Sequence, residues 1–85
     1  MAIGRVPAAA VEMRVVRRRL DACRLTPREK ELVYLLLEGC ANKEIAGRCN
    51  IAVQTVKDHF RHVYQKTGVH QRTALLARLL GTGQR

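Results

Sequence analysis

Residues 42–68 read NKEIAGRCNIAVQTVKDHFRHVYQKTG, from Asn42 to Gly68. Apolar residues recur at helical spacing in two runs, one before Asn50 and one after it. Asparagine tolerates the left-handed backbone of a tight turn, so Asn50 predicts a turn between two helices, with Ile51 filling the corner. The second helix is expected from Ala52–Val53 to Gly68. The inward residues are Ile45, Ala46 and Cys49 in the first run and Val56, Phe60 and Val63 in the second.

The chain is short and strongly basic. Its 85 residues suffice for one small domain, and 16 Lys and Arg against seven Asp and Glu give a net charge of +9. Such a charge favours an anionic partner, either nucleic acid or an acidic membrane surface. Only one Phe and two Tyr are present, and no strand-like alternation occurs, which excludes an RNA-stacking sheet.

Three further helices are expected around this stretch, so the predicted fold is all-α. The segment after Leu25 has a T-x-x-E capping box from Thr26 to Glu29, and predicts a helix over residues 27–38. Asn42 is expected to cap the short helix. A last helix is expected over residues 72–80, stopped by Gly81. Residues 1–7 are expected to be an extended or disordered lead-in, because Gly4 and Pro7 disfavour a helix.

The N-terminal helix, expected over residues 8–23, allows more than one interpretation. Met13, Val16, Leu20 and Cys23 form one apolar stripe, and Arg14, Arg17 and Arg18 lie largely off it. The helix is either a linker that packs its stripe on the domain or on a partner protomer, or a basic arm that contacts phosphates. A membrane-surface helix is weaker, since no aromatic residue anchors its apolar side. We assign residues 1–24 to an N-terminal arm and helix, and residues 25–85 to the domain.

Several classes of function lack candidate residues. No apolar run approaches the ~20 residues of a membrane span, and no signal peptide precedes the domain, so a cytoplasmic protein without a membrane partner is expected. The pair His59 and His62, with Cys40 and Cys49 upstream, has no C-x-x-C spacing, so no metal is expected. Neither a nucleophile–base set nor a glycine-rich phosphate loop occurs, so we expect neither an enzyme nor a bound cofactor.

The segments LTPREKELVYLLLEG, NKEIA, TVKDHF and TGV together resemble the DNA-binding domain of LuxR-type (GerE-type) transcription regulators, over about Leu25 to Leu80. The resemblance implies a four-helix domain with a helix-turn-helix, here with an additional N-terminal helix. Its third helix would enter the major groove and its fourth would dimerise. Many members carry an N-terminal receiver or ligand-binding domain, for which 24 residues are too few; a complete chain would resemble the small stand-alone members. Ala52 departs from the usual Ser or Thr cap, which predicts a weakened helix start.

The expected DNA-binding residues follow from the outward face and from the resemblance. Arginine pairs well with guanine, and Asp58 either accepts from cytosine N4 or pairs within its helix with Arg61 or His62, the second being slightly favoured. The helix starts near Lys43 and Thr55 offer amide groups to phosphates. The base-facing set is Gln54, Lys57, Asp58 and Arg61, and the phosphate-facing set is Asn42, Lys43, Thr55, His59 and Arg72.

The last helix has more leucine than one buried face needs. Leu75, Leu76, Leu79 and Leu80 cover more than one side, and exposed leucines require a cover. This surplus predicts a homodimer through these four residues.

The predicted function is therefore a sequence-specific, double-stranded DNA-binding transcription regulator, acting as a homodimer on inverted half-sites, with a possible RNA polymerase contact. A promoter-reading sigma-factor domain shares the L-T-x-R-E and E-I-A elements, but the leucine-rich helix after Gly68 argues against it. A protein-interaction module that uses the helix-turn-helix as a scaffold is the alternative from a different class.

Overall fold

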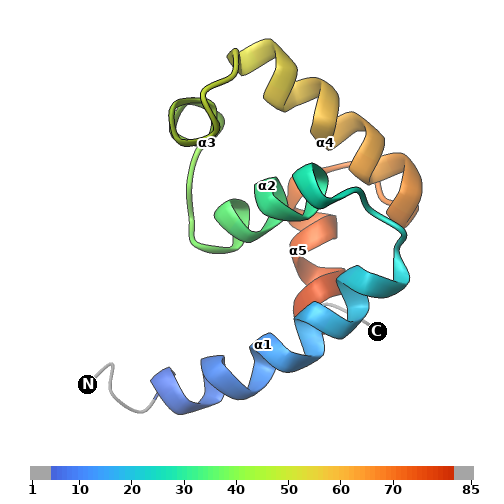
Figure 1. Ribbon diagram of the computed structural model, residues 1–85. Helices are drawn as coiled ribbons and strands as arrows, with labels where there is room; N and C mark the ends of the chain where they lie inside the picture. The colour runs from blue at the N-terminus through green and yellow to red at the C-terminus, as the bar shows by residue number, and fades with distance from the viewer. Residues whose placement is uncertain (1–4, 82–85) are drawn as a thin grey trace.

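The computed structural model describes residues 5–81, with side chains described from Met13 onward. Over this range the chain forms five α-helices, as the all-α prediction requires. They are α1 (Arg5–Ala22), α2 (Pro27–Leu37), α3 (Asn42–Cys49), α4 (Val53–Thr67) and α5 (Arg72–Leu80). In Figure 1, α4 runs along the upper side, α1 lies at the bottom, and α2 and α5 lie between them.

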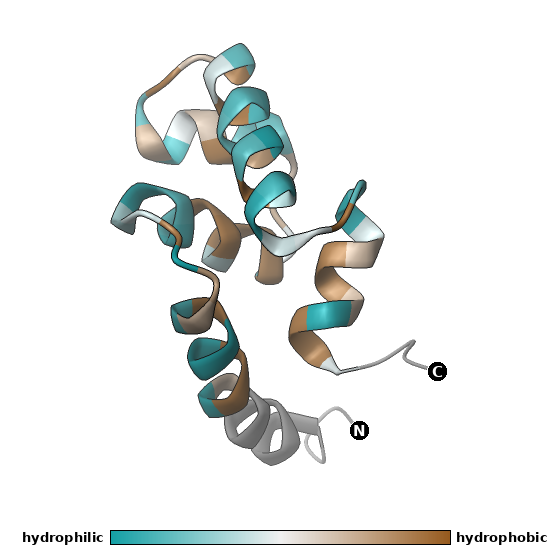
Figure 2. Ribbon diagram, turned by 90° about the vertical axis from the view of Figure 1, so that its right-hand side faces the viewer, coloured by the Kyte–Doolittle hydropathy of each residue, from teal (hydrophilic) through white to brown (hydrophobic). Residues whose placement is uncertain are grey.

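One hydrophobic core joins all five helices. Its fully buried members include Val16 and Leu20 of α1, Val33 of α2, Ile45 of α3 and Leu79 of α5. From α4 the three expected inward residues Val56, Phe60 and Val63 are all buried. The hydropathy view shows the same separation, with α4 polar on the side turned away from the core (Figure 2).

The α1 helix packs its apolar stripe on its own domain, against α5. Val16 and Leu20 are 1% and 0% exposed, and Met13 and Cys23 pack against the same core. Of the two linker alternatives, the one in which the stripe lies on the domain itself is therefore observed. Arg14, on the other side of the helix, is exposed.

Two expected helix starts are wrong. The N-terminal helix begins at Arg5, so Pro7 lies in its first turn, where proline removes no hydrogen bond because those amides have no helical partner. The rest of the expected lead-in, residues 1–4, lies outside the described part. The cap of α3 is Ala41 and not Asn42, and Glu44 Oε1 accepts from the Ala41 amide at 3.1 Å.

The turn between α3 and α4 has the expected chemistry. Asn50 ends α3 in the left-handed conformation, with φ of 57° and ψ of 47°. The Ile51 amide donates to the Ala46 carbonyl at 3.0 Å, and the Ile51 side chain packs on the core. These contacts fix where α4 leaves α3.

Candidate nucleic-acid interface

The outward side of α4 carries the four residues predicted to face bases. Gln54, Lys57 and Arg61 are exposed and Asp58 is half-buried. The opposite side of the helix is closed by the core, because Val56 is 0% exposed. Since one side is anchored and the other is uncovered, α4 offers a polar, donor-rich surface on a rigid element.

Asp58 organises that surface. Its Oδ1 accepts from Gln54 Nε2 at 3.2 Å and lies 3.1 Å from an Arg61 guanidinium nitrogen. Gln54 and Arg61 stand one turn before and one turn after Asp58, so one carboxylate orients both side chains. The slightly favoured interpretation, an intrahelical pair with Arg61, is present in the structure. Lys57 forms no ion pair or hydrogen bond with the described residues.

The start of α4 has no side-chain cap. Ala52 is its N-cap, with extended backbone at φ −74° and ψ 154°, and no side-chain hydrogen bond closes the first turn. The first amide groups of α4 therefore keep their donors for water or for an anion. The uncapped helix start is thus found at the expected residue, Ala52.

Two contacts that the sequence did not reveal hold the far end of α4. Lys66 Nζ lies 2.7 Å from Glu29 Oε1, and Glu29 is only 4% exposed. The same carboxylate accepts from the Thr26 amide at 2.8 Å, so the capping box of α2 also anchors α4. Arg78 of α5 donates to the Thr67 carbonyl at 2.8 Å, which satisfies the last turn of α4.

These contacts shift the acid–base behaviour of Glu29. Burial alone raises the pKa of this carboxyl group, but the hydrogen bonds from Lys66 and Thr26 and the charge of Lys66 outweigh it, so the pKa lies below its ordinary value. The charged form of Glu29 is thus the form that the fold stabilises. The sequence predicted Glu29 as part of the capping box of α2, but no sequence pattern predicted its ion pair with Lys66.

The five predicted phosphate-facing residues do not form one uniform set. Lys43 is exposed in the first turn of α3, whereas Thr55 and His59 are half-buried on α4. Asn42 and Arg72 are hydrogen-bonded to each other: an Arg72 guanidinium nitrogen donates to Asn42 Oδ1 at 2.5 Å. Arg72 also lies over the ring of Phe60. The structure therefore gives these last two residues an internal partner that the sequence did not predict.

The leucines of α5 divide between the core and the surface. Leu75 and Leu79 are 0% exposed and pack inside one chain, so they are not available to a partner while α1 stays in place. The sequence predicts a dimer contact through all four leucines; with Leu75 and Leu79 in the core, that prediction is left with the two more exposed leucines. Leu76 is half-buried, and Leu80 is 37% exposed.

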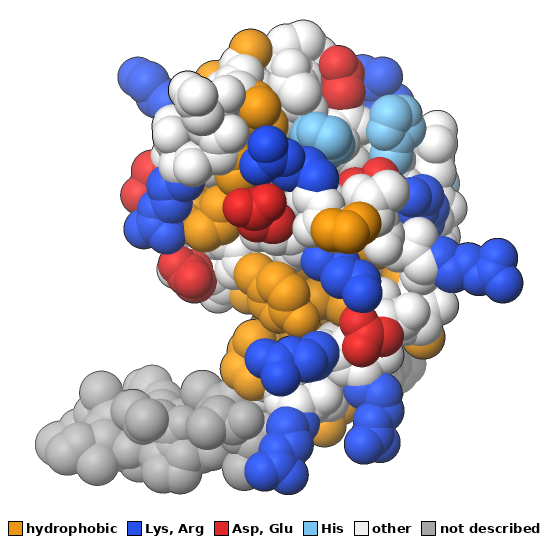
Figure 3. Space-filling model, in the orientation of Figure 1, with side chains coloured by type: hydrophobic (Ala, Val, Ile, Leu, Met, Phe, Trp, Pro, Cys, Tyr) orange, Lys and Arg blue, Asp and Glu red, His pale blue; other side chains and the backbone are white. Residues whose placement is uncertain are grey.

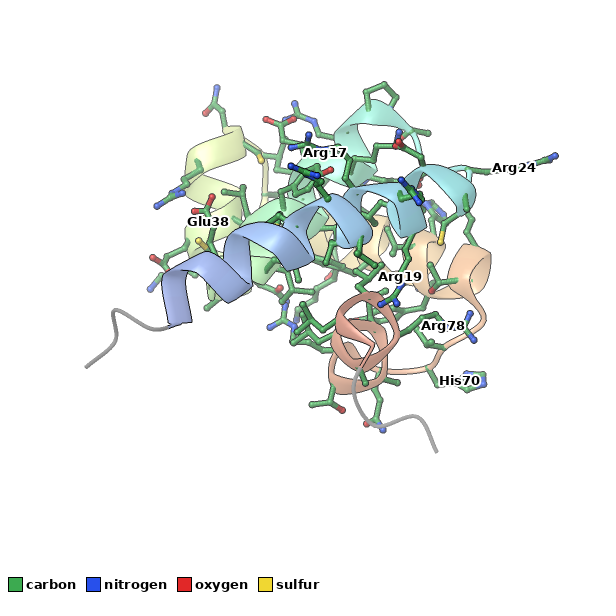
Figure 4. The ribbon with its side chains drawn as sticks, turned by 90° about the horizontal axis from the view of Figure 1, so that it is seen from below. Arg17, Arg19, Arg24, Glu38, His70 and Arg78 are labelled. Carbon is green, nitrogen blue, oxygen red and sulfur yellow. The ribbon has the colours of Figure 1, made fainter. Side chains whose placement is uncertain are left out.

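The underside of the molecule is also basic. Arg19 reaches from α1 over the end of α5 and donates to the Leu79 carbonyl at 2.8 Å (Figure 4). Arg24 points away from the body in the same view. Figure 3 shows Lys and Arg side chains spread over the whole front face, with carboxylates between them.

Other kinds of site find little support among the described side chains. No group of three His, Cys, Asp or Glu lies close enough to hold a metal ion in this part of the chain. An open hollow of about 380 Å³ lies at the end of α4, between Arg61, Tyr64 and His70. None of the described helices is both long and apolar enough to cross a membrane.

Known proteins resemble the chain over this same region. Residues 24–79 match the family of bacterial regulatory proteins described as the luxR family. The monoamine regulon transcriptional regulator of Klebsiella aerogenes is 44% identical over 54 residues, covering 64% of this chain and 24% of that protein. Putative HTH-type transcriptional regulators of Mycobacterium bovis and Mycobacterium tuberculosis are 44% identical over 52 residues, covering 61% of this chain.

The chain spans about a quarter of the length of the first relative and 6% of the other two. No solved structure matches it. The family match covers most of the chain and includes α2, α3 and α4 in full. It favours a regulator over the sigma-factor alternative. The helix-turn-helix made by α3 and α4 and the family match agree, and the chain belongs to the luxR family of bacterial regulatory proteins, which are DNA-binding transcription regulators.

Proposed function

We propose that this chain binds double-stranded DNA sequence-specifically, with α4 in the major groove, and acts as a homodimer on two inverted half-sites. The observation that carries the proposal is the division of α4 into a fully buried side and an uncovered side with Lys57 and the Gln54–Asp58–Arg61 network. A regulator of chromosomal genes would work in the cytoplasm, and a contact with RNA polymerase would follow at the promoter.

In this arrangement Arg61 and Lys57 donate to purine edges, and Asp58 orients Arg61 through their ion pair. Lys43, together with the uncapped start of α4, would bind phosphates and fix the register. A protomer that neutralises about five phosphates gives a log–log salt slope of about −4 to −5, doubled for a dimer.

Selection of bound duplexes from a random pool tests the proposal directly. We expect a palindromic site with half-sites about one helical turn apart. Arg61→Gln should relax the selected sequence at one position per half-site and cost about 1–3 kcal/mol of discrimination. Arg48→Gln is the matched control, because Arg48 is an exposed arginine of the preceding helix that pairs with Glu38 at 3.1 Å. The proposal would be contradicted if the selected duplexes shared no sequence, or if the affinity for DNA did not depend on salt concentration.

The test of Asp58 separates base reading from positioning. Asp58→Asn keeps the shape but removes the charge that holds Arg61. If Asp58 only orients Arg61, the preferred sequence stays the same while discrimination at the Arg61 position weakens. A change of preference at a neighbouring cytosine would instead show that Asp58 reads that base.

A further inference from the structure

Three helices meet at Arg72. This first residue of α5 donates from one guanidinium nitrogen to Asn42 Oδ1, at 2.5 Å, in the first turn of α3. Its guanidinium carbon lies 5.5 Å from the centroid of the Phe60 ring, in the middle of α4. Phe60 is itself buried, with 3% exposure, and its ring stacks at 6.1 Å on that of Tyr64. One side chain from α5 therefore touches both helices of the helix-turn-helix.

We propose that Arg72 is a positioning residue: it sets the angle between α3 and α4 for DNA binding, and does not itself bind a phosphate. This inference rests on the proposed function. A planar guanidinium offers a flat face to an aromatic ring and, at its edge, a hydrogen bond in the same plane. Arg72 contacts the Phe60 ring at cation–π distance and hydrogen-bonds Asn42, so the ring and the amide together hold the side chain.

The partners of the Arg72 side chain support a positioning role. Arg72 is half-buried, and among the described residues it has a neutral amide and a ring for partners, with no carboxylate. A carboxylate would hold the guanidinium more strongly, but it would add a second negative charge, beside that of Glu44, at the start of α3, where a phosphate is expected. Asn42 thus holds Arg72 without adding negative charge to this helix start.

Lysine and alanine substitutions distinguish positioning from phosphate binding. Arg72→Lys keeps the positive charge but loses the planar face and the fork. Asn42→Ala removes no charge at all. If Arg72 positions the helices, each variant should lose about tenfold or more in affinity for the selected duplex, with an unchanged salt slope. The double variant should lose no more affinity than the weaker-binding of the two single variants, because both substitutions break the same Arg72–Asn42 contact.

The measurement is made at low temperature, where circular dichroism shows that all variants are folded. Affinity for an unrelated duplex should change less than threefold, because phosphate contacts supply that binding. Arg78→Lys is the matched control: Arg78 lies on the same helix and bonds the Thr67 carbonyl, but it does not join α3 to α4. It should lower stability and leave the ratio of specific to non-specific affinity unchanged.

A second readout does not depend on DNA. Residual dipolar couplings of backbone amides in α3 and α4 report the angle between the two helices. Asn42→Ala and Arg72→Lys should both change that angle, and Arg78→Lys should not. If the native protein selects no duplex, the proposed function is wrong. The angle between α3 and α4 still tests whether Arg72 positions the two helices. The inference would be overturned if Asn42→Ala or Arg72→Lys kept both the native affinity for the selected duplex and the native angle between α3 and α4.

Discussion

At the level of single residues, Ala52 limits the stability of the helix that would bind DNA. Its backbone has the extended geometry of an N-cap, but its methyl group accepts no hydrogen bond. Ala52→Ser should therefore raise the free energy of unfolding by about 1 kcal/mol, because serine can accept from the first turn of α4. Thermal or denaturant unfolding measures this directly.

A serine introduced inside a helix is the control for that change. Ala77→Ser in the middle of α5 adds the same hydroxyl where the backbone amides already have helical partners, so it should not stabilise the protein. Equal effects at the two positions would mean that capping is not the reason for any gain at residue 52.

Glu29 makes the stability of the domain depend on pH. Because its pKa is lower in the folded chain, its contribution is present above the ordinary value of 4.5 and is lost as the pH falls through the lowered value. Glu29→Gln should cost about 1–2 kcal/mol at neutral pH, since Lys66 is partly exposed to solvent and loses its partner. The difference from the native protein should shrink as the pH drops below that range.

Glu31→Gln provides the comparison on the same helix. Glu31 pairs with Arg28 at 3.2 Å, and both side chains are well exposed, so its loss should change stability by less than about 0.5 kcal/mol. A pH profile of unfolding that is the same for Glu29→Gln and the native protein would rule out the lowered pKa.

At the level of elements, local signals predicted most of the fold. The capping box at Thr26 placed the start of α2, and Asn50 placed the turn, because each depends on contacts within three or four residues. The cap of α3 was missed because Asn42 is the better capping residue by type, yet its side chain is held by Arg72, 30 residues away. No pattern along the chain reports such a contact.

The leucines of α5 show the same limit for the predicted dimer surface. Their number indicated two apolar sides, but only the folded chain shows that Leu75 and Leu79 lie in the core and that α5 packs against α1. Likewise, the α4 face was predictable from helical periodicity, whereas the bonding of Gln54 and Arg61 to one carboxylate oxygen depends on rotamers. Sequence patterns thus predict which side is buried better than they predict which polar groups pair.

The remaining surface of α5 makes a definite prediction about assembly. If a homodimer forms through this helix, Leu80, which is 37% exposed, is the leucine most available to it, with Leu76 beside it one turn earlier. Leu80→Glu should then halve the molar mass measured by sedimentation equilibrium, because a buried unpaired carboxylate opposes association. Val53→Glu changes an equally exposed residue, at 38%, on α4 and should leave the mass unchanged. The same mass for native protein and Leu80→Glu would place any dimer contact elsewhere.

At the level of the whole molecule, two groups of basic side chains that have no ion pair among the described residues lie on opposite sides. Five ion pairs between described residues neutralise part of the positive charge, including Arg48 and Lys66. Of the basic side chains left without a carboxylate, Lys43 and Lys57 belong to α3 and α4, and a second group belongs to α1. In both ribbon views α1 lies at the bottom and α4 in the upper part (Figures 1 and 2). The exposed arginines of α1 are Arg14, Arg17 and Arg18.

This separation predicts unequal effects on DNA binding. The molecule is 36 × 27 × 20 Å in extent, and salt screens exposed charges beyond about 8 Å at physiological ionic strength. Changing the three α1 arginines to Gln should therefore alter affinity for the selected duplex by less than about threefold. Changing Lys43 and Lys57 to Gln removes fewer charges but should lower affinity by tenfold or more, and the loss of the Lys43 phosphate contact should lower the salt slope by about one per protomer. If the α1 variant loses as much affinity and slope as the lysine variant, α1 contacts phosphates, and the basic-arm interpretation of the N-terminal helix is the correct one.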